Sequence, residues 1–281
     1  MLITLILTLT ILGSLGICYT SGAFVGFAWL WVLPVSLAGL FILCLALAFL
    51  FLWIVCQLAN SEKPQEEDSR FYRFITNLYV AALVPLVRAK ITTRGLEKTP
   101  KDGRFLLVCN HIHDIDPAVL FWCFKKSQLA FIGKKETKDM FLVGKIMPKL
   151  LCQFVNREND REALKTIIKC IQIVKEDKAS VGVFPEGRIH KDRKLHRFRP
   201  GVFKIAQKTN VPIVVCTLRN TQYVLSNFLK GGSTDVEVHL LDVIPPEEHQ
   251  DKTTVEIADR VHAMMAADLG PELVTEDEES T

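Results

Sequence analysis

The stretch that decides the fold is Phe105-Leu-Leu-Val-Cys-Asn-His-Ile-His-Asp-Ile-Asp-Pro117. Its first five residues, 105–109, are apolar, and a short apolar run that ends in polar residues predicts a buried strand. Proline is favoured in the first turn of a helix, so a helix is expected to begin near Pro117. The stretch therefore predicts a strand, a turn and a helix, with polar side chains presented where the strand ends.

Two residues of this turn, His111 and Asp116, are candidates for proton transfer. On an ideal helix, which advances about 100° per residue, positions five apart point about 140° away from each other. The two side chains can therefore meet only across a turn. A histidine that is oriented by a carboxylate can take a proton from an alcohol. Asp114 is a rival partner for the imidazole, and His113 is interpreted as a surface histidine.

Two other interpretations of the turn stay open. Asp116 comes just before Pro117, so its side chain is also a candidate helix N-cap, and a carboxylate held in that way would still orient an imidazole. The spacing of His111, His113 and Asp116 resembles the start of a dinuclear metal site. That motif needs Asp and then His where this chain has Ile115 and Asp116, and the other histidines show no grouping. We therefore expect no metal.

Outward from this stretch, short apolar runs alternate with helical patterns. Strands are expected at 105–109, 129–132, 180–184, 213–218 and 236–243, and helices near 118–124, 160–175, 202–208 and 255–268. This alternation predicts an α/β fold with a central, mostly parallel or mixed sheet flanked by helices. In open sheets of this kind, ligands bind outside the carboxyl ends of the strands.

The N-terminal part of the chain is entirely uncharged, since residues 1–61 contain no Asp, Glu, Lys or Arg. The apolar stretches Leu2–Ile17 and Ala28–Leu58 predict an N-terminal transmembrane helical hairpin, joined by the polar link Tyr19–Gly22. The first stretch would make a helix about 24 Å long, slightly short for a bilayer core of about 30 Å. A signal peptide is the alternative for it, but the positively charged region that such a peptide needs is missing.

The distribution of charge predicts the orientation of the hairpin. Basic residues follow the second stretch closely and none precedes it; they are Lys63, Arg70, Arg73, Arg88 and Lys90. The positive-inside rule then puts the charged part of the chain on the cytoplasmic face. Eight cysteines without any Cys-x-x-Cys pair are typical of reduced, mostly buried thiols rather than of a disulfide framework or a zinc site.

The chain is thus expected in four parts: a membrane anchor of two apolar helices (1–60), a linker with a candidate interfacial helix (61–94), an α/β domain (95–270) and an acidic disordered tail (271–281). Within the second part, Phe71–Ala89 interleaves aromatic, aliphatic and arginine residues. That pattern fits a helix lying along lipid headgroups, broken near Pro85, and equally a helix packed on the domain.

A second motif, Phe184-Pro-Glu-Gly-Arg188, again follows an expected strand. Glycine lets a ligand approach the backbone, and arginine can grip a phosphate through two parallel hydrogen bonds. Cations gather around it, with six Lys or Arg between Arg188 and Arg199 and with Lys134 and Lys135 after another strand. A solvated basic loop would explain these charges. With an anchor on the same chain, anionic lipid headgroups or a phosphorylated substrate explain them better than nucleic acid does.

Together these residues resemble the glycerophospholipid acyltransferase family, most closely the 1-acyl-sn-glycerol-3-phosphate acyltransferases, or lysophosphatidic acid acyltransferases. The family has four sequence blocks in a fixed order, and this chain has a counterpart of each over roughly residues 95–218. The counterparts are Asn110-His111 with Asp116-Pro117, then Gly133-Lys134-Lys135 with Gly144 and Arg157, then Phe184–Gly187, and last Val211–Ile213.

The chain also departs from the family pattern. The family often has Ser at the position of His113, Pro at Phe141 and Asp at Asn156. After Glu-Gly it usually has Thr and then Arg, where this chain has Arg188 and Ile189. The last departure affects phosphate binding most, so it bears on the identity of the acceptor rather than on the reaction class.

The resemblance implies an enzyme that transfers an acyl group to the sn-2 hydroxyl of 1-acyl-sn-glycerol 3-phosphate, making phosphatidic acid for phospholipid synthesis. It implies His111 and Asp116 as catalytic residues, and Lys134, Lys135, Arg157, Glu186, Gly187 and Arg188 as substrate-binding residues. Coenzyme A or acyl carrier protein would deliver the acyl group, with no metal or other cofactor, and the partner surface would be a lipid bilayer. The alternatives are an acyltransferase for glycerol 3-phosphate or another lysophospholipid, and a non-catalytic membrane-binding protein.

Overall fold

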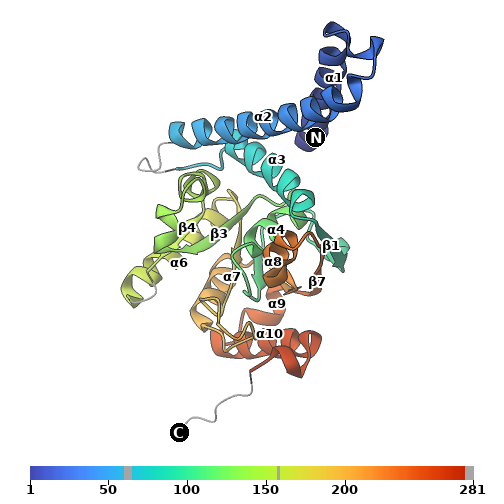
Figure 1. Cartoon of the computed structure of the whole chain (residues 1–281). Helices are drawn as coiled ribbons and strands as arrows, with labels where there is room; N and C mark the ends of the chain where they lie inside the picture. The colour runs from blue at the N-terminus through green and yellow to red at the C-terminus, as the bar shows by residue number, and fades with distance from the viewer. Residues whose placement is uncertain (60–64, 157–158, 276–281) are drawn as a thin grey trace. The chain divides into compact units, whose positions relative to one another are not determined.

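The computed structural model describes residues 1–59, 65–156 and 159–275. The chain divides into two compact units, Met1–Glu62 and Lys63–Thr281 (Figure 1). The first unit is a helical hairpin of α1 (Leu2–Thr20) and α2 (Trp29–Leu58), with the short 3-10 helix η1 (Ala23–Val25) in the turn. The helix α1 runs three residues beyond the expected Ile17, so the link begins at Ser21.

Both hairpin helices are long and apolar enough to cross a membrane. They pack closely where Gly13 faces α2, because a Cβ on that glycine would come within 2.8 Å of Leu40 Cδ1. Small residues at such contacts let apolar helices approach each other in lipid. Large apolar side chains such as Leu12 and Trp31 point outward and are 63% and 65% exposed. An apolar surface of this extent is typical of helices that associate with a membrane.

The second unit is built on a seven-stranded sheet in the order β1-β7-β6-β2-β5-β3-β4. The strands are β1 (Ala89–Arg94), β2 (Leu106–Cys109), β3 (Leu129–Lys134), β4 (Gln153–Val155), β5 (Ser180–Val183), β6 (Ile213–Arg219) and β7 (Thr234–Ile244). The five strands from β6 to β4 are parallel, while β7 runs antiparallel to β6 and β1 parallel to β7. The predicted α/β fold with a mixed sheet is confirmed.

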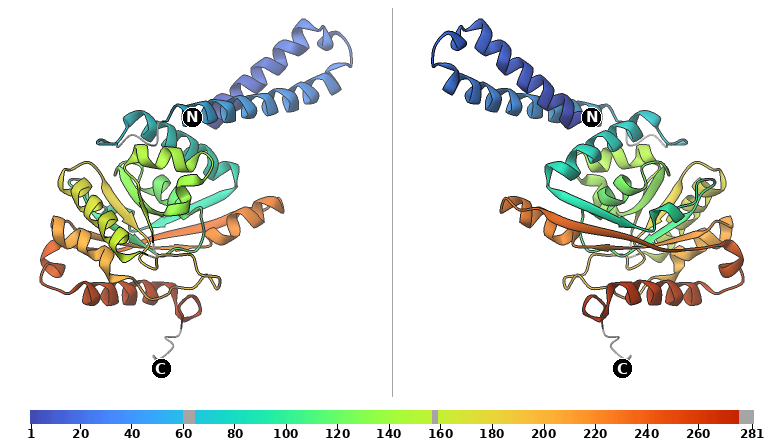
Figure 2. Two further views of the ribbon diagram at one scale, coloured as in Figure 1. Left: turned by 90° about the vertical axis from the view of Figure 1, so that its left-hand side faces the viewer. Right: turned by 90° about the vertical axis from the view of Figure 1, so that its right-hand side faces the viewer.

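Helices cover both faces of the sheet (Figure 2). One core lies under α3 (Arg70–Leu86), α4 (Asp116–Cys123) and α8 (Val224–Leu229), with the short α5 (Val143–Ile146) nearby. The other lies under α6 (Asp160–Lys175), α7 (Lys204–Thr209) and α10 (Thr254–Leu269), which α9 (Pro246–His249) precedes. Alternate residues of β2 point into the two cores, Leu107 into the first and Leu106 into the second, as the twofold period of a strand requires.

The helix α3 is packed on this unit through a buried arginine. Arg73 is 8% exposed, forms a 2.9 Å ion pair with Asp68, and donates to the carbonyl of Leu129 at 2.8 Å. A buried cation is stabilised only when its donors find partners, as they do here. The outer face of α3 still carries the exposed Phe71 and Phe74.

The structure differs from the predicted elements in three places. The helix α3 ends at Leu86, so Ala89 begins the strand β1 rather than ending a helix, and the sheet starts within the expected linker 61–94. The strand β4 was not predicted. The start of the expected tail 271–281 is folded, because Thr275 N–H donates to the carbonyl of Leu195 at 3.1 Å; residues 276–281 lie outside the described part.

Candidate active site

Four polar loops leave the sheet at the carboxyl ends of β2, β3, β5 and β6, because these strands are parallel and end on the same side. This side of the sheet is here called its carboxyl edge. Asn110, the first residue after β2, is buried and fastens this edge. Its side-chain amide donates to the carbonyl of Leu218 on β6 at 3.0 Å and accepts from the N–H of the same residue at 2.7 Å. The turn that follows Asn110 thus starts from a fixed point.

The structure brings His111 and Asp116 together, as the sequence predicts. His111 Nδ1 lies 2.8 Å from Asp116 Oδ2, across a turn in which Asp116 N–H donates to the carbonyl of His113 at 3.0 Å. The carboxyl side chain is fully buried, whereas the imidazole is 14% exposed. A carboxylate on Nδ1 favours the tautomer that carries its proton there, which leaves Nε2 with a lone pair for a substrate proton.

Asp116 is held by more than the imidazole. Its Oδ2 also accepts the backbone N–H of Ile112 at 2.8 Å and of His113 at 2.9 Å. The residue is therefore not the N-cap that the sequence suggested, because Ile115 occupies that position and Asp116 is already helical. The carboxylate turns back to bind the preceding turn instead of the helix that follows it.

A fourth donor to Asp116 is Thr221, which sequence reasoning missed. This fully buried residue begins the 3-10 helix η6 (Thr221–Tyr223) after β6, and its hydroxyl donates to Asp116 Oδ1. The two residues are 105 positions apart, and no local pattern marks Thr221. Its hydroxyl binds one carboxylate oxygen and leaves the other for the imidazole.

Glu186 lies beside the pair, and its carboxyl group accepts from backbone donors. His111 N–H donates to its Oε1 at 2.8 Å, and His196 N–H donates to its Oε2 at 3.1 Å. Burial raises the pKa of Glu186 to about 8, although the two N–H groups act to lower it. This residue, expected to bind substrate, has both carboxyl oxygens engaged within the protein and joins the β2 turn to the basic loop 188–199.

The face of the imidazole rests on an aromatic stack. The rings of His111 and Phe184 are stacked with centroids 4.1 Å apart, and Phe184 stacks in turn on Phe131 at 5.8 Å. The next residues turn sharply: Gly187 has φ 79°, and a Cβ there would come within 3.0 Å of Arg199 Nε. The positive φ favours glycine at that point, and the side chain of Arg199 fills the space beside it.

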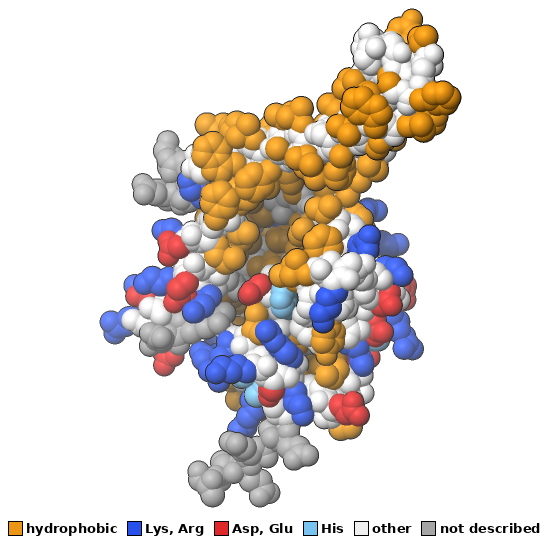
Figure 3. Space-filling view, in the orientation of Figure 1, with side chains coloured by type: hydrophobic (Ala, Val, Ile, Leu, Met, Phe, Trp, Pro, Cys, Tyr) orange, Lys and Arg blue, Asp and Glu red, His pale blue; other side chains and the backbone are white. Residues whose placement is uncertain are grey.

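The predicted cationic residues are exposed around this edge. Lys134, Lys135 and Arg188 all lie at the surface, and Lys134 pairs with Glu136 at 3.4 Å. The described residues give no contact between these side chains and the His111 pair, and Arg157 lies outside the described residues. Figure 3 shows cations on both sides of the second unit and over its lower front.

One cation does contact the turn that holds His111 and Asp116. Arg193, named in the sequence only as part of a basic run, is half-buried and donates through Nη1 to the carbonyl of Ile112. Beside it, the rings of His190 and His196 stack with centroids 3.5 Å apart, and His196 Nε2 binds Asp192 at 3.0 Å. The basic loop is thus a folded part of the site's surroundings.

The other two polar residues of the turn, His113 and Asp114, do not join the pair of His111 and Asp116. Asp114 is exposed, and His113 Nδ1 accepts the N–H of Ile115 at 3.3 Å. Within the described part of the chain, no three His, Cys, Asp or Glu side chains are grouped so that they could hold a metal ion. Burial raises the pKa of the Cys109 thiol well above its usual range, which makes this neighbour of the site a poor nucleophile.

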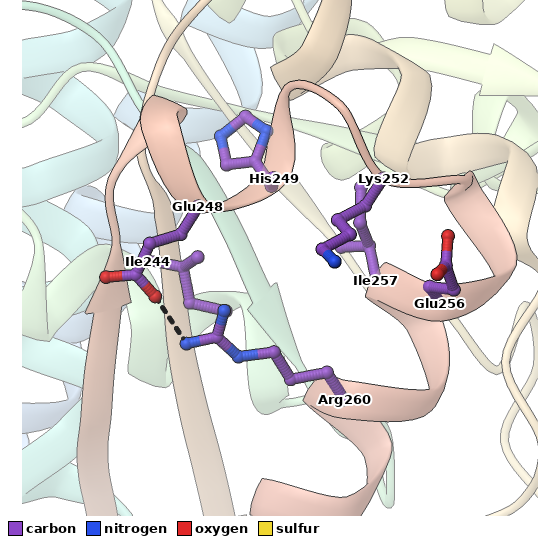
Figure 4. Close-up of a pocket in the computed structure, with 7 residues that line it drawn as sticks. All are labelled: Ile244, Glu248, His249, Lys252, Glu256, Ile257 and Arg260. Carbon is purple, nitrogen blue, oxygen red and sulfur yellow. Dashed lines mark hydrogen bonds and ion pairs between the residues drawn. The ribbon is translucent and has the colours of Figure 1, made fainter.

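A small cavity of about 130 Å³ lies elsewhere, between α9 and α10 (Figure 4). Arg260 and Glu248 form a 2.7 Å ion pair at its wall, and Lys252 and Glu256 lie on the other side. None of the residues expected at the catalytic site lines it, so we assign it no part in the chemistry.

Several known proteins resemble this chain in sequence. Residues 90–219 match the family model described as Acyltransferase. A 1-acyl-sn-glycerol-3-phosphate acyltransferase of Borreliella burgdorferi is 28% identical over 176 residues, which are 61% of this chain and 70% of that protein. One of Chlamydomonas reinhardtii is 30% identical over 214 residues, which are 72% of this chain and 59% of that protein.

Among solved structures, the crystal structure of the 1-acyl-sn-glycerophosphate (LPA) acyltransferase from Thermotoga maritima resembles this chain with a TM-score of 0.57 and 19% identity. The match covers 78% of this chain and 87% of the other. At that identity the likeness concerns the fold. The chain spans 50% to 59% of the length of several curated relatives.

Proposed function

We propose that this chain, whose residues 90–219 match the family model described as Acyltransferase, acylates the sn-2 hydroxyl of 1-acyl-sn-glycerol 3-phosphate. The acyl group comes from a thioester of coenzyme A or acyl carrier protein, and the product is phosphatidic acid. The observation that carries the proposal is the 2.8 Å contact between His111 Nδ1 and buried Asp116.

The reaction begins at His111 Nε2. An alcohol is a poor nucleophile until a base removes its proton, and a neutral imidazole is suited to that step. The acceptor oxygen bonds to the thioester carbon as its proton moves to Nε2. The C–S bond then breaks, and the thiolate leaves with the proton that the imidazole returns. The acceptor attacks directly, so no protein nucleophile takes part.

Asp116 serves this cycle by orienting the ring and by stabilising the imidazolium that forms midway. Its four donors keep the carboxylate in one position, so it need not reorganise during the reaction. Glu186 holds the backbone N–H of His111 and so fixes where the ring starts. The aromatic ring of Phe184 supports the face of the imidazole.

The acceptor phosphate is bound by the cations of the same edge. Arg188, Lys134 and Lys135 are exposed, so their charges are available to bind the phosphate dianion of the acceptor. The family pattern adds Arg157 to this set. Arginine is suited to two parallel hydrogen bonds with phosphate, and lysine to a point charge.

The membrane is the source of the acceptor and the destination of the product. The two N-terminal helices hold the chain at a bilayer, and the charge bias after the second helix favours a cytoplasmic catalytic unit. Acyl-CoA and acyl carrier protein thioesters are both water-soluble donors that would reach that face.

The test is transfer of a labelled acyl group by the purified full chain in lipid vesicles. Each donor is combined with lysophosphatidic acid, glycerol 3-phosphate or a lysophospholipid with a larger headgroup. We expect phosphatidic acid as the main product and a fall in activity when Lys134 and Lys135 are replaced together by Ala. Preference for glycerol 3-phosphate would reject the acceptor, and no transfer from either donor would reject the reaction.

A further inference from the structure

The loop after β3 carries four consecutive apolar residues, Met140–Val143, which are here called the apolar tip. The side chains of Met140, Phe141 and Val143 are 49%, 63% and 45% exposed. Scattered apolar residues on a surface need no explanation, but a contiguous group points to an interaction site.

The apolar tip is held by backbone hydrogen bonds within its own loop. Met140 N–H donates to the carbonyl of Thr137 at 3.1 Å, and Gly144 N–H donates back to the carbonyl of Met140 at 3.0 Å. A Cβ on Gly144 would lie 2.1 Å from the carbonyl oxygen of Lys138, so only glycine lets the loop close. Backbone groups thus pair within the loop while the apolar side chains point outward.

Lysines surround the apolar tip. Five of them flank it, at 134, 135, 138, 145 and 149, against only two acids, Glu136 and Asp139. Lys134, Lys135 and Lys138 are exposed. An apolar centre with a cationic rim complements a bilayer that has anionic headgroups over a hydrocarbon interior.

The tip also leaves the sheet at the catalytic edge. The strand β3 runs parallel to β5, which runs parallel to β2, so all three strands end on one side. His111 follows β2, Glu186 follows β5, and the apolar tip follows β3. A membrane surface bound by this loop would therefore lie next to the strand ends where acyl transfer is proposed.

We propose that the apolar tip inserts into the interfacial layer of an anionic phospholipid bilayer, as a second membrane contact besides the helical hairpin. Met140, Phe141 and Val143 enter the layer, and the flanking lysines bind its headgroups. The contact turns the catalytic edge toward the lipid. The docking stands on the loop alone, and only its benefit to catalysis rests on the proposed function.

Photocrosslinking in the full chain tests the contact itself. A benzophenone amino acid replaces Phe141, and in a control it replaces Val255, which is 53% exposed on α10 at the opposite edge of the sheet. The chain is reconstituted in vesicles of phosphatidylcholine with phosphatidylglycerol. We expect lipid adducts at 141 and few at 255. Adducts of 141 with the hairpin or with a second copy, in place of lipid, would overturn the proposal.

A kinetic arm tests the consequence. Phe141→Asp should lower kcat/KM about tenfold for lysophosphatidic acid in vesicles, since a charge opposes insertion. It should leave kcat/KM unchanged for a short-chain acceptor dissolved in water, and Val255→Asp should change neither value. An equal loss with both acceptors would contradict docking. If the wild type proves inactive, the crosslinks still decide the docking, and the proposed function fails separately.

Discussion

Two buried carboxyl groups at neighbouring strand ends, Asp116 and Glu186, have opposite surroundings. Asp116 accepts from an imidazole, two backbone N–H groups and the Thr221 hydroxyl. Among the described residues, Glu186 accepts from two backbone N–H groups and from no side chain, and burial raises its pKa to about 8. In the proposed mechanism, Asp116, which shares a side-chain donor, serves catalysis. Glu186, which binds backbone N–H groups, holds two loops together.

The largest effect is expected from removing the imidazole of His111, which binds Asp116 but not the side chain of Glu186. His111→Ala leaves Asp116 without its imidazole and should lower kcat by about 10³-fold or more, because general base catalysis typically contributes about 10²- to 10⁴-fold. The measurement is acyl transfer in vesicles under saturating donor. His113→Ala is the matched control and should retain most of the activity; the reverse ranking would reassign the base.

Asp116→Asn keeps the size of the side chain but removes its charge. We expect kcat to fall by about 10³-fold, since an amide neither fixes the Nδ1–H tautomer nor stabilises the imidazolium. Asp114→Asn, at the exposed rival position, should have little effect. Comparable losses in both variants would mean that the partner of His111 has been misassigned.

Glu186→Gln tests the bracing role. It leaves one of the two backbone donors without an acceptor and should lower kcat about 30-fold, in line with a cost of about 2 kcal/mol for a broken buried hydrogen bond.

The same variant tests the pKa through stability. Between pH 4.5 and about 8 the folded Glu186 holds a proton that the unfolded chain has lost. Its contribution to stability is therefore complete below pH 4.5 and is lost as the pH rises toward 8, at about 1.4 kcal/mol per pH unit. Thermal unfolding in detergent measures this slope, which Glu186→Gln should reduce; an unchanged slope would show that Glu186 does not titrate in this range.

Thr221→Val removes the one side-chain donor on Asp116 Oδ1 and should lower kcat about fivefold, with KM unchanged, for a loss of about 1 kcal/mol. Thr221→Ser retains the hydroxyl and should recover most of the rate. If Ser and Val behave alike, the methyl packing of Thr221 matters and its hydrogen bond does not.

The smallest effect is expected from replacing the exposed Arg188. Arg188→Ala should raise KM for lysophosphatidic acid about threefold and leave kcat nearly unchanged, since exposed charge pairs contribute about 1 kcal/mol or less. Arg197→Ala, also exposed on the basic loop, is the control. A large fall in kcat for Arg188→Ala would move that residue into the reaction itself.

The sequence predicts the pairing of His111 with Asp116 because both residues lie in one local turn between a strand and a helix. It does not predict Thr221, since that contact depends on how β6 lies beside β2. It misses β1, a polar and largely exposed edge strand, and β4, which has only three residues. The N-cap assignment of Asp116 is wrong because the carboxylate turns back to Ile112 and His113.

The central claim is that the acceptor attacks the thioester directly, with His111 as the base. The most direct measurement is release of the free thiol in a single turnover, with and without lysophosphatidic acid. The account predicts thiol release only when the acceptor is present, at the rate at which phosphatidic acid forms. A stoichiometric burst of thiol without acceptor would reveal an acylated protein and contradict the account.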